Sequence, residues 1–395
     1  MLARSGAGES TFVGCTIVAR NYLSFARVLS SAWAKQHEQV PFVVLVIDDD
    51  VEMRPAEHEN QEFVRPEEIG IDPGELDQMR GIYDVAEMTT ALKPRFVRHL
   101  LERGSGAVVY LDSDMDLLGP VHELAETART SGVALSPHLF GPPPTDAFLT
   151  EIDYAMYGQY NSGLIAVGAS AREFVDWWAR RTRWDCLFDE PAGLHADQRW
   201  LDCVPVYFEH AVIGDAGLNV AAWNLHERPF ALEGERPTVA GVPLRAFHFA
   251  GFDPHRPERV TAYAPSTYDN EPILLKVRHH YAERLLAAGY DQYREIPYRY
   301  RSTASGRPLG RWDRLVYREA LMAVSANGGP EIPGPFDASR SEEFERMLAH
   351  PRSLGVLTLP QLGALENARV RLRNGGWDRR RLVTAIDLRL RARLR

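Results

Sequence analysis

The first two-thirds of this chain alternate between short β-branched runs and longer amphipathic stretches, and this alternation limits the possible folds more than any other feature. It is typical of an α/β sheet with helices packed on its faces. Between the first two runs, Tyr22, Phe25, Ala26, Leu29 and Trp33 recur at helical spacing, so the chain should open with a β-α-β unit. The expected strands are residues 12–19, 41–48, 106–114, 132–137, 162–168 and 244–251.

Helical spacing also predicts helices over residues 87–101 and 171–181. A segment at 256–272 mixes prolines with polar residues, as linkers do, and helical periods dominate after it, with a break at 326–337. The length of 395 residues allows more than one structural unit. We therefore expect a sheet unit over 1–260 and a mostly helical region with a basic tail over 261–395.

Composition and charge exclude several classes of protein. With 45% hydrophobic and 25% charged residues, the chain is typical of a globular protein. The net charge of −9 opposes non-specific nucleic-acid binding. No apolar run approaches the roughly 20 residues that cross a bilayer, and the first residues do not form a secretion signal. Cys15, Cys186 and Cys203 lack metal-site spacing and are expected to be free thiols, which favours a cytoplasmic location.

The C-terminal tail has the opposite charge. Residues 369–395 contain ten arginines and two aspartates, with leucines spaced among them. One interpretation is a solvated helix face. The other is peripheral contact with a partner or with anionic lipid at the inner face of the membrane.

Acidic residues follow the apolar run Val108–Leu111 in the sequence Asp112-Ser113-Asp114. Because alternate residues of a strand point to the same side, we expect the carboxylates of Asp112 and Asp114 to converge. Two converging carboxylates are costly unless a cation neutralises them. The pattern therefore predicts a divalent metal site, with solvated strand-end acids as the alternative.

His248 stands at the end of another apolar run. It could be a core histidine, but beside the two acids it would complete a mixed oxygen and nitrogen site that suits Mn²⁺ and leaves positions open for phosphates. Gly251 would allow the backbone to approach a diphosphate closely.

Amide, carboxylate and indole side chains lie between these two sites in the sequence. Asn161 precedes the run 162–168, and Asp197 and Gln198 precede an apolar stretch that they could simply cap. These side chains could instead accept hydrogen bonds from sugar hydroxyls. Trp223 with Asn224 adds the combination of an apolar face and a polar rim that carbohydrate sites need.

In chain order, these segments resemble metal-dependent GT-A-fold glycosyltransferases, most closely the family 8-like retaining group that includes glycogenin and bacterial lipopolysaccharide galactosyltransferases. The resemblance covers roughly residues 11–260. Its motifs are T-I-V-A-R-N-Y-L from Thr16, E-M-T-T-A-L-K-P from Glu87, Y-L-D-S-D from Tyr110, Y-N-S-G-L from Tyr160, A-D-Q-R-W from Ala196, N-V-A-A-W-N from Asn219 and H-F-A-G-F from His248.

The resemblance implies a Rossmann-like mixed sheet with helices on both faces. It also implies a hexosyltransferase that uses a nucleoside-diphosphate sugar, with UDP favoured over GDP, and that retains the anomeric configuration. The acceptor would be a hydroxyl of a glycan, a lipid-linked molecule or a small molecule. Inversion, with Asp197 as general base, stays open on the residues alone.

The same resemblance assigns roles to residues. Asp112, Asp114 and His248 would hold Mn²⁺ or Mg²⁺, and Asn161, Asp197 and Gln198 would hold the donor sugar, with Gln198 near the reacting face. The residues expected to contact the nucleotide or its diphosphate are Thr16, Ala19, Arg20, Asn21, Lys93, Asp112, Ser113, Asp114 and Gly251.

The basic contacts to the diphosphate depart from the family pattern. Arg95 is an alternative to Lys93, because the spacing leaves the alignment loose by two residues. The family places a lysine six residues after the metal histidine, where this chain has Pro254. The positive charge would then come from Arg256, from Lys93 or from the metal alone.

Three other classes compete with this interpretation. A dehalogenase-like phosphohydrolase would use Asp112 as nucleophile. That class normally has Thr or Val two residues after the second aspartate, where this chain has Asp116. It also needs a downstream lysine, and the only one here is Lys276. A nucleotidyltransferase would want glycines in the first strand-to-helix loop, which has none between Thr16 and Tyr22. A non-catalytic scaffold that binds a partner through its C-terminal region is the third.

Overall fold

A computed structural model describes residues 12–48, 60–263, 268–351, 357 and 359–373. Its centre is a seven-stranded sheet with the order β10-β6-β7-β4-β1-β2-β3. Within this sheet β7 runs antiparallel to β4 and β6, and the other neighbours are parallel. The predicted mixed α/β sheet is confirmed. The strands are β1 (Phe12–Val18), β2 (Phe42–Val46), β3 (Gln61–Val64), β4 (Ala107–Leu111), β6 (Val133–Pro137), β7 (Tyr160–Gly168) and β10 (His210–Val212).

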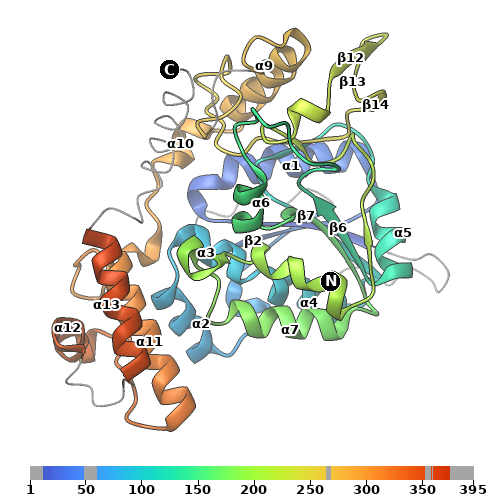
Figure 1. Cartoon of the computed structure of the whole chain (residues 1–395). Helices are drawn as coiled ribbons and strands as arrows, with labels where there is room; N and C mark the ends of the chain where they lie inside the picture. Colours follow the sequence, from blue (N-terminus) through green and yellow to red (C-terminus); the bar gives the residue numbers. More distant parts are fainter. Residues whose placement is uncertain (1–11, 49–59, 264–267, 352–356, 358, 374–395) are drawn as a thin grey trace.

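Helices cover both faces of this sheet (Figure 1). Side chains that alternate along each strand explain the two layers: Val108 and Tyr110 pack toward one group of helices, Val109 and Leu111 toward the other. The first group is α2 (Pro73–Ile82), α3 (Val85–Ala91), α4 (Lys93–Glu102) and α7 (Arg172–Thr182). The second is α1 (Leu23–Gln36) and α5 (His122–Ser131).

The helix expected over residues 87–101 is in fact two helices, α3 and α4, that meet at Leu92. Pro94 explains the break, because proline has no N–H to donate and its ring collides with the carbonyl four residues earlier. At the other end, Asp84 caps α3 by accepting hydrogen bonds from the backbone of Ala86 and Glu87.

Three smaller sheets lie beside the main one. The first has the order β11-β15-β5, formed by β11 (Val220–Ala221), β15 (Ala246–His248) and β5 (Met115–Leu117). The run expected as one strand over 106–114 therefore ends at Leu111, and β5 belongs to a different sheet. The others are β12 (Phe230–Glu233) with β13 (Arg236–Val239) and β14 (Val242–Pro243), and the hairpin of β8 (Phe188–Asp189) with β9 (Leu194–His195).

The C-terminal part of the described chain is helical. Figure 1 shows α9 and α10 beside α1, and α11 to α13 as a group beside α2. The expected break at 326–337 is present, because α11 ends at Asn327 and the next helical turn starts at Ala338. The helices are α9 (Pro272–Ala287), α10 (Tyr290–Arg294), α11 (Arg311–Asn327), α12 (Ser341–Ala349) and α13 (Leu359–Arg373). Most of the basic tail lies outside the described residues.

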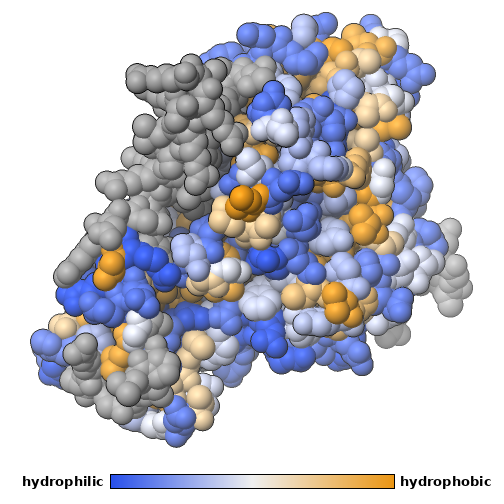
Figure 2. Space-filling model, viewed as in Figure 1, coloured by the Kyte–Doolittle hydropathy of each residue, from blue (hydrophilic) through white to orange (hydrophobic). Residues whose placement is uncertain are grey.

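Two short helices, α6 (Glu151–Tyr157) and α8 (Val204–Tyr207), complete the fold. Apolar and hydrophilic residues are intermixed over the described part of the face in Figure 2. Within the residues that the structure describes, no helix is both long enough and apolar enough to span a membrane. All three cysteines are free thiols, as expected.

His37, which follows α1, makes part of the stability dependent on pH. Its Nε2 accepts a hydrogen bond from Val121 N at 3.1 Å, and burial, aided by the charge of His122, lowers the pKa of His37 to about 4. An unfolded histidine has a pKa near 6.5, so the unfolded chain binds more protons between these values and stability falls as the pH drops through this window.

We expect the His37→Gln variant to lose less stability on acidification than the wild type. Between pH 6.5 and 4, its midpoint of thermal unfolding should fall by about 2 to 5 °C less. Some dependence will persist, because burial also lowers the pKa of His138, to about 3. His279→Gln, at an exposed position on α9, is the control. Parallel pH profiles for wild type and His37→Gln would contradict the assignment.

Candidate active site

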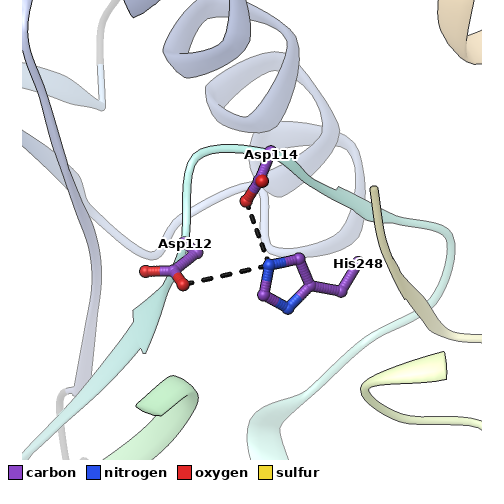
Figure 3. A group of neighbouring side chains, drawn as sticks. All are labelled: Asp112, Asp114 and His248. Atoms are coloured by element: carbon purple, nitrogen blue, oxygen red, sulfur yellow. Dashed lines mark ion pairs between the residues drawn. The ribbon is translucent and has the colours of Figure 1, made fainter. Parts of the chain in front are cut away.

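Asp112, Asp114 and His248 lie together beyond the carboxyl end of β4 (Figure 3). Nε2 of His248 is 3.1 Å from Oδ1 of Asp114 and 3.9 Å from Oδ2 of Asp112. One ligand atom of each residue lies within 4.8 Å of the others. The carboxylate side chains are 31% and 23% exposed, so a ligand can reach them. Two carboxylates and one imidazole form a donor set that fits Mn²⁺ or Mg²⁺.

The two carboxylates favour the protonated, positively charged form of the His248 imidazole. Burial opposes a charge on His248, but the carboxylates of Asp114 and Asp112 outweigh it and raise the pKa of His248 above its ordinary value. His248 Nδ1 lies 3.4 Å from Asn219 Oδ1, and its ring forms a T-shaped contact with the ring of Trp223, at 5.1 Å between centroids. These contacts hold the imidazole with Nε2 toward the acids.

A turn and a second sheet, not strand alternation, bring the three residues together. β4 ends before Asp112, and Met115 N donates to Asp112 O at 3.0 Å to close the turn. β5 then pairs with β15, which places Met115 opposite His248. Phe249 N donates to Asp114 O at 2.8 Å. The expected convergence is present, but the strand alternation from which we expected it ends at Leu111, before either aspartate.

Lys93 lies fully buried beneath this cluster. Its Nζ is 2.9 Å from Asp197 Oδ2 and 3.7 Å from Asp112 Oδ1, and it donates to the carbonyl and hydroxyl of Ser162 at 2.9 and 3.1 Å. It also lies over the ring of Tyr110. Burial opposes the charge of Lys93, but Asp197 and Asp112 outweigh it and raise the pKa of Lys93.

The carboxyl of Asp112 is held in its charged form by its neighbours. Burial would raise the pKa of Asp112, but Lys93, His248 and a hydrogen bond from the hydroxyl of Tyr110 at 2.9 Å together lower it. Arg95, the alternative to Lys93, points elsewhere: it binds Glu75 and donates to the carbonyl of Ala179 at 3.0 Å. The structure therefore places Lys93, and not Arg95, beside the acids.

Asn161, Asp197 and Gln198 lie next to Ser162 and Lys93 and are linked to them and to one another by hydrogen bonds and an ion pair. Asn161 Nδ2 donates to Gln198 Oε1 at 3.0 Å, and Gln198 Nε2 donates to Tyr157 O at 2.9 Å. Ser162 Oγ donates to Asp197 Oδ1 at 3.0 Å. Asp197 stands at the start of a 3-10 helix, but its side chain makes no capping hydrogen bond. The simple capping interpretation is therefore wrong.

Four of the residues expected near the nucleotide lie within β1 or directly after it. Ala19 is buried, and Arg20 and Asn21 open a short helical turn. Asn21 Oδ1 is buried and makes no hydrogen bond among the described residues. Thr16 lies inside β1 with its side chain fully covered. The sequence reasoning missed Asp48, which is buried after β2 and accepts from Arg20 N at 2.8 Å.

Ser113 and Gly251 flank the metal residues in sequence. Ser113 is buried in the turn between Asp112 and Asp114. Gly251 has a φ of +70°, and a Cβ there would lie 2.4 Å from the ring of Tyr263. Only glycine fits this position without a shift. Further along, Pro254 is buried and Arg256 is exposed.

Four residues of the candidate site and of the segments beside it were not singled out from the sequence. They are Tyr110, Ser162, Gly163 and Asp48. The first three stood inside quoted motifs, so a signal existed, but their roles depend on contacts across strands. The remaining acid of the run, Asp116, points away from this group: it is buried and accepts two hydrogen bonds from Arg284 of α9, at 2.6 and 2.8 Å.

Gly163 lies directly against the side chains of Asp112, His248 and Asn161, so a larger residue there should disturb the site. A Cβ at this position would lie 2.6 Å from Asp112 Oδ2, 2.6 Å from His248 Cε1 and 2.8 Å from Asn161 Oδ1. We expect Gly163→Ala to push the ligands apart and to weaken Mn²⁺ binding by about tenfold or more. Thermal-shift titration with Mn²⁺ measures this effect. Gly141→Ala, where a Cβ meets nothing within 4 Å, is the control, and a wild-type Mn²⁺ response in Gly163→Ala would contradict the prediction.

No protein-family model matches the chain. The chain is 26% identical over 257 residues to a Bacillus subtilis (strain 168) protein, the uncharacterized protein YfnD, over 62% of this chain and 78% of YfnD. Among solved structures it is similar to the galactosyltransferase LgtC in complex with donor and acceptor sugar analogs, with a TM-score of 0.43 and 13% identity. An active-site mutant of LgtC gives a TM-score of 0.43 and 14% identity. Each alignment covers 74% of this chain and 99% of LgtC.

Proposed function

We propose that this chain is a metal-dependent glycosyltransferase that moves a sugar from a nucleoside-diphosphate sugar to an acceptor hydroxyl. The observation that carries the proposal is the convergence of Asp112, Asp114 and His248 beyond the carboxyl end of β4, a central strand of the mixed sheet. Ligands of such sheets bind at the carboxyl ends of the strands. The order of the seven motifs along the sequence supports the same interpretation.

Asp112, Asp114 and His248 would hold Mn²⁺ or Mg²⁺ against the diphosphate of the donor. Such an ion, when bound, stabilises the negative charge that grows on the departing nucleoside diphosphate. Lys93 keeps Asp112 ionised and so maintains the ligand set. Ala19, Arg20 and Asn21 would meet the nucleoside, because they lie at the end of the neighbouring strand β1.

Asn161, Asp197 and Gln198 would position the donor sugar beside the metal site. Asp197 is almost fully buried, is paired with Lys93 and accepts a hydrogen bond from Ser162. This engagement argues against Asp197 as a general base and therefore supports retention over inversion. Gln198 is held by Asn161 and Tyr157, so it presents a fixed amide to the reacting face.

We further propose hexosyl transfer from a UDP-sugar, with a glycan, a lipid-linked molecule or a small molecule as acceptor. The catalytic site would belong to residues 1–260, with 261–395 as a helical extension. We place the reaction in the cytoplasm, and the basic tail would contact a partner or the inner face of the membrane.

A screen followed by an assay tests the proposal. UDP-sugars and GDP-sugars are compared by thermal shift with Mn²⁺, and the sugar nucleotide with the largest shift is used in a hydrolysis assay with and without EDTA. We expect release of nucleoside diphosphate that EDTA abolishes. Release of inorganic phosphate, or binding without any release, would contradict a transferase and favour a phosphohydrolase or a scaffold.

A further inference from the structure

One face of α11 carries three arginines that reach back to the sheet unit. Arg311, Arg314 and Arg318 are three and four residues apart, a spacing that places them on the same side of a helix. Arg314 is buried, and its guanidinium donates to the backbone carbonyls of Arg80, Gly81, Tyr83 and Tyr300 at 2.5 to 3.2 Å. It therefore anchors α11 to the end of α2.

The other two arginines of this face bind the segment that leads into the β8–β9 hairpin. Arg318 Nε donates to Trp184 O at 2.7 Å, and its Nη2 pairs with Asp185. Arg311 donates to Phe188 O at 3.4 Å and pairs with the fully buried Glu87.

Two further contacts fix the position of β8. Glu87 itself accepts a hydrogen bond from Phe188 N at 3.0 Å, so Arg311 and Glu87 together hold both backbone groups of Phe188. Arg371 of α13 adds a contact to Asp189 Oδ2 at 3.3 Å. Charged hydrogen bonds of this kind, in partly buried positions, are stronger than neutral ones.

The braced hairpin ends at the donor-sugar residues. β8 pairs with β9 through Phe188 opposite His195, and Ala196 N donates to Leu187 O at 2.9 Å. Asp197 and Gln198 follow at once. Ala196 has a φ of +49°, which is strained for a residue with a side chain. Such a conformation persists only where its surroundings impose it.

We propose that Arg311 and Arg318, with Arg371, are positioning residues for the donor-sugar site. They would act through the β8–β9 hairpin, whose position decides where Asp197 and Gln198 stand relative to the metal residues. The helical C-terminal region is then a part of the catalytic apparatus. This inference rests on the proposed function, because the sugar subsite is its object.

Affinity measurements with and without the sugar moiety test the proposal. Dissociation constants for UDP and for UDP-glucose or UDP-galactose, each with Mn²⁺, are measured for the wild type, Arg318→Ala, Arg318→Lys and Arg371→Ala. We expect UDP affinity to stay within about twofold of wild type and the sugar nucleotide to bind about fivefold or more weakly in Arg318→Ala. The affinity of Arg318→Lys for the sugar nucleotide should lie between those of the wild type and Arg318→Ala, because lysine keeps the charge but lacks the guanidinium group that reaches two acceptors.

Arg340→Ala is the matched control, since Arg340 binds Glu331 and Glu343 within the C-terminal region. Equal weakening of UDP and sugar nucleotide, or a change in thermal midpoint without any change in sugar-nucleotide affinity, would overturn the inference.

Hydrogen exchange separates this inference from the proposed function. Amides of residues 185–197 should exchange faster in Arg318→Ala than in the wild type or Arg340→Ala. Unchanged exchange overturns the bracing, whatever the protein binds. Faster exchange in a protein whose wild type binds neither UDP nor a UDP-sugar would instead show that the proposed function is wrong.

Discussion

On the function proposed above, Asp114→Asn should reduce metal-dependent turnover of the sugar nucleotide by about a thousandfold. The physical reason is the loss of one of two anionic ligands that face Nε2 of His248 at the cluster. In the metal-free protein the midpoint of thermal unfolding should change by no more than about 2 °C, because Asp114 is partly exposed and contributes one ion pair. The stabilisation that Mn²⁺ gives to the wild type should disappear.

Asp116→Asn provides the matched comparison for this experiment. Asp116 lies two residues further along the same acidic run, but it is buried against Arg284 and away from the metal residues. We expect this variant to lose stability and to keep its Mn²⁺ response, the opposite of Asp114→Asn. Retained activity in Asp114→Asn would remove Asp114 from the metal site.

Lys93→Met should destabilise the protein by about 3 to 5 kcal/mol. Lys93 is the only described group within ion-pair distance of Asp197, whose side chain is almost fully buried, so its removal leaves an uncompensated charge in the interior. The midpoint of thermal unfolding should fall by roughly 5 to 10 °C, and urea denaturation gives the free energy of unfolding directly.

The chain supplies its own controls for this variant. Its other lysines, Lys35 and Lys276, are both exposed, and Lys35→Met and Lys276→Met should leave stability within about 0.5 kcal/mol of wild type. Lys93→Met combined with Asp197→Asn should recover part of the loss, since the buried charge is then absent. A free energy of unfolding equal to wild type in Lys93→Met would mean that Lys93 is not charged in the folded protein.

Local patterns were reliable where the structure depends on neighbours along the chain. The β-branched runs did form β1, β2, β4, β6 and β7, because period-two burial is a property of each strand by itself. The same reasoning failed at Asp112, where the chain leaves β4 for a turn. It also failed at Pro94, where the helix expected over 87–101 breaks, although proline is a local signal that could have been used.

The candidate site shows the same division. Residue types predicted that Asp112, Asp114 and His248 could hold a hard cation, but nothing in their spacing says that β15 pairs with β5. Lys93 and Arg95 were indistinguishable by alignment, and only the folded chain directs one to Asp112 and the other to Glu75. The partners of Asp48 and of the α11 arginines could not be predicted, because they lie far away in the sequence.

The amino-acid sequence by itself determined the mixed α/β sheet and the residue types of a candidate metal site, because periodicity and side-chain chemistry are properties of short segments. Only the tertiary structure decided that a turn and a second sheet bring Asp112, Asp114 and His248 together. It also decided that Lys93 is buried next to Asp112, and that arginines of α11 contact β8 and the segment before it, which lead to Asp197. These features depend on contacts between segments that are distant in sequence. Such contacts contribute to the free energy of folding only when the folded backbone brings the segments together.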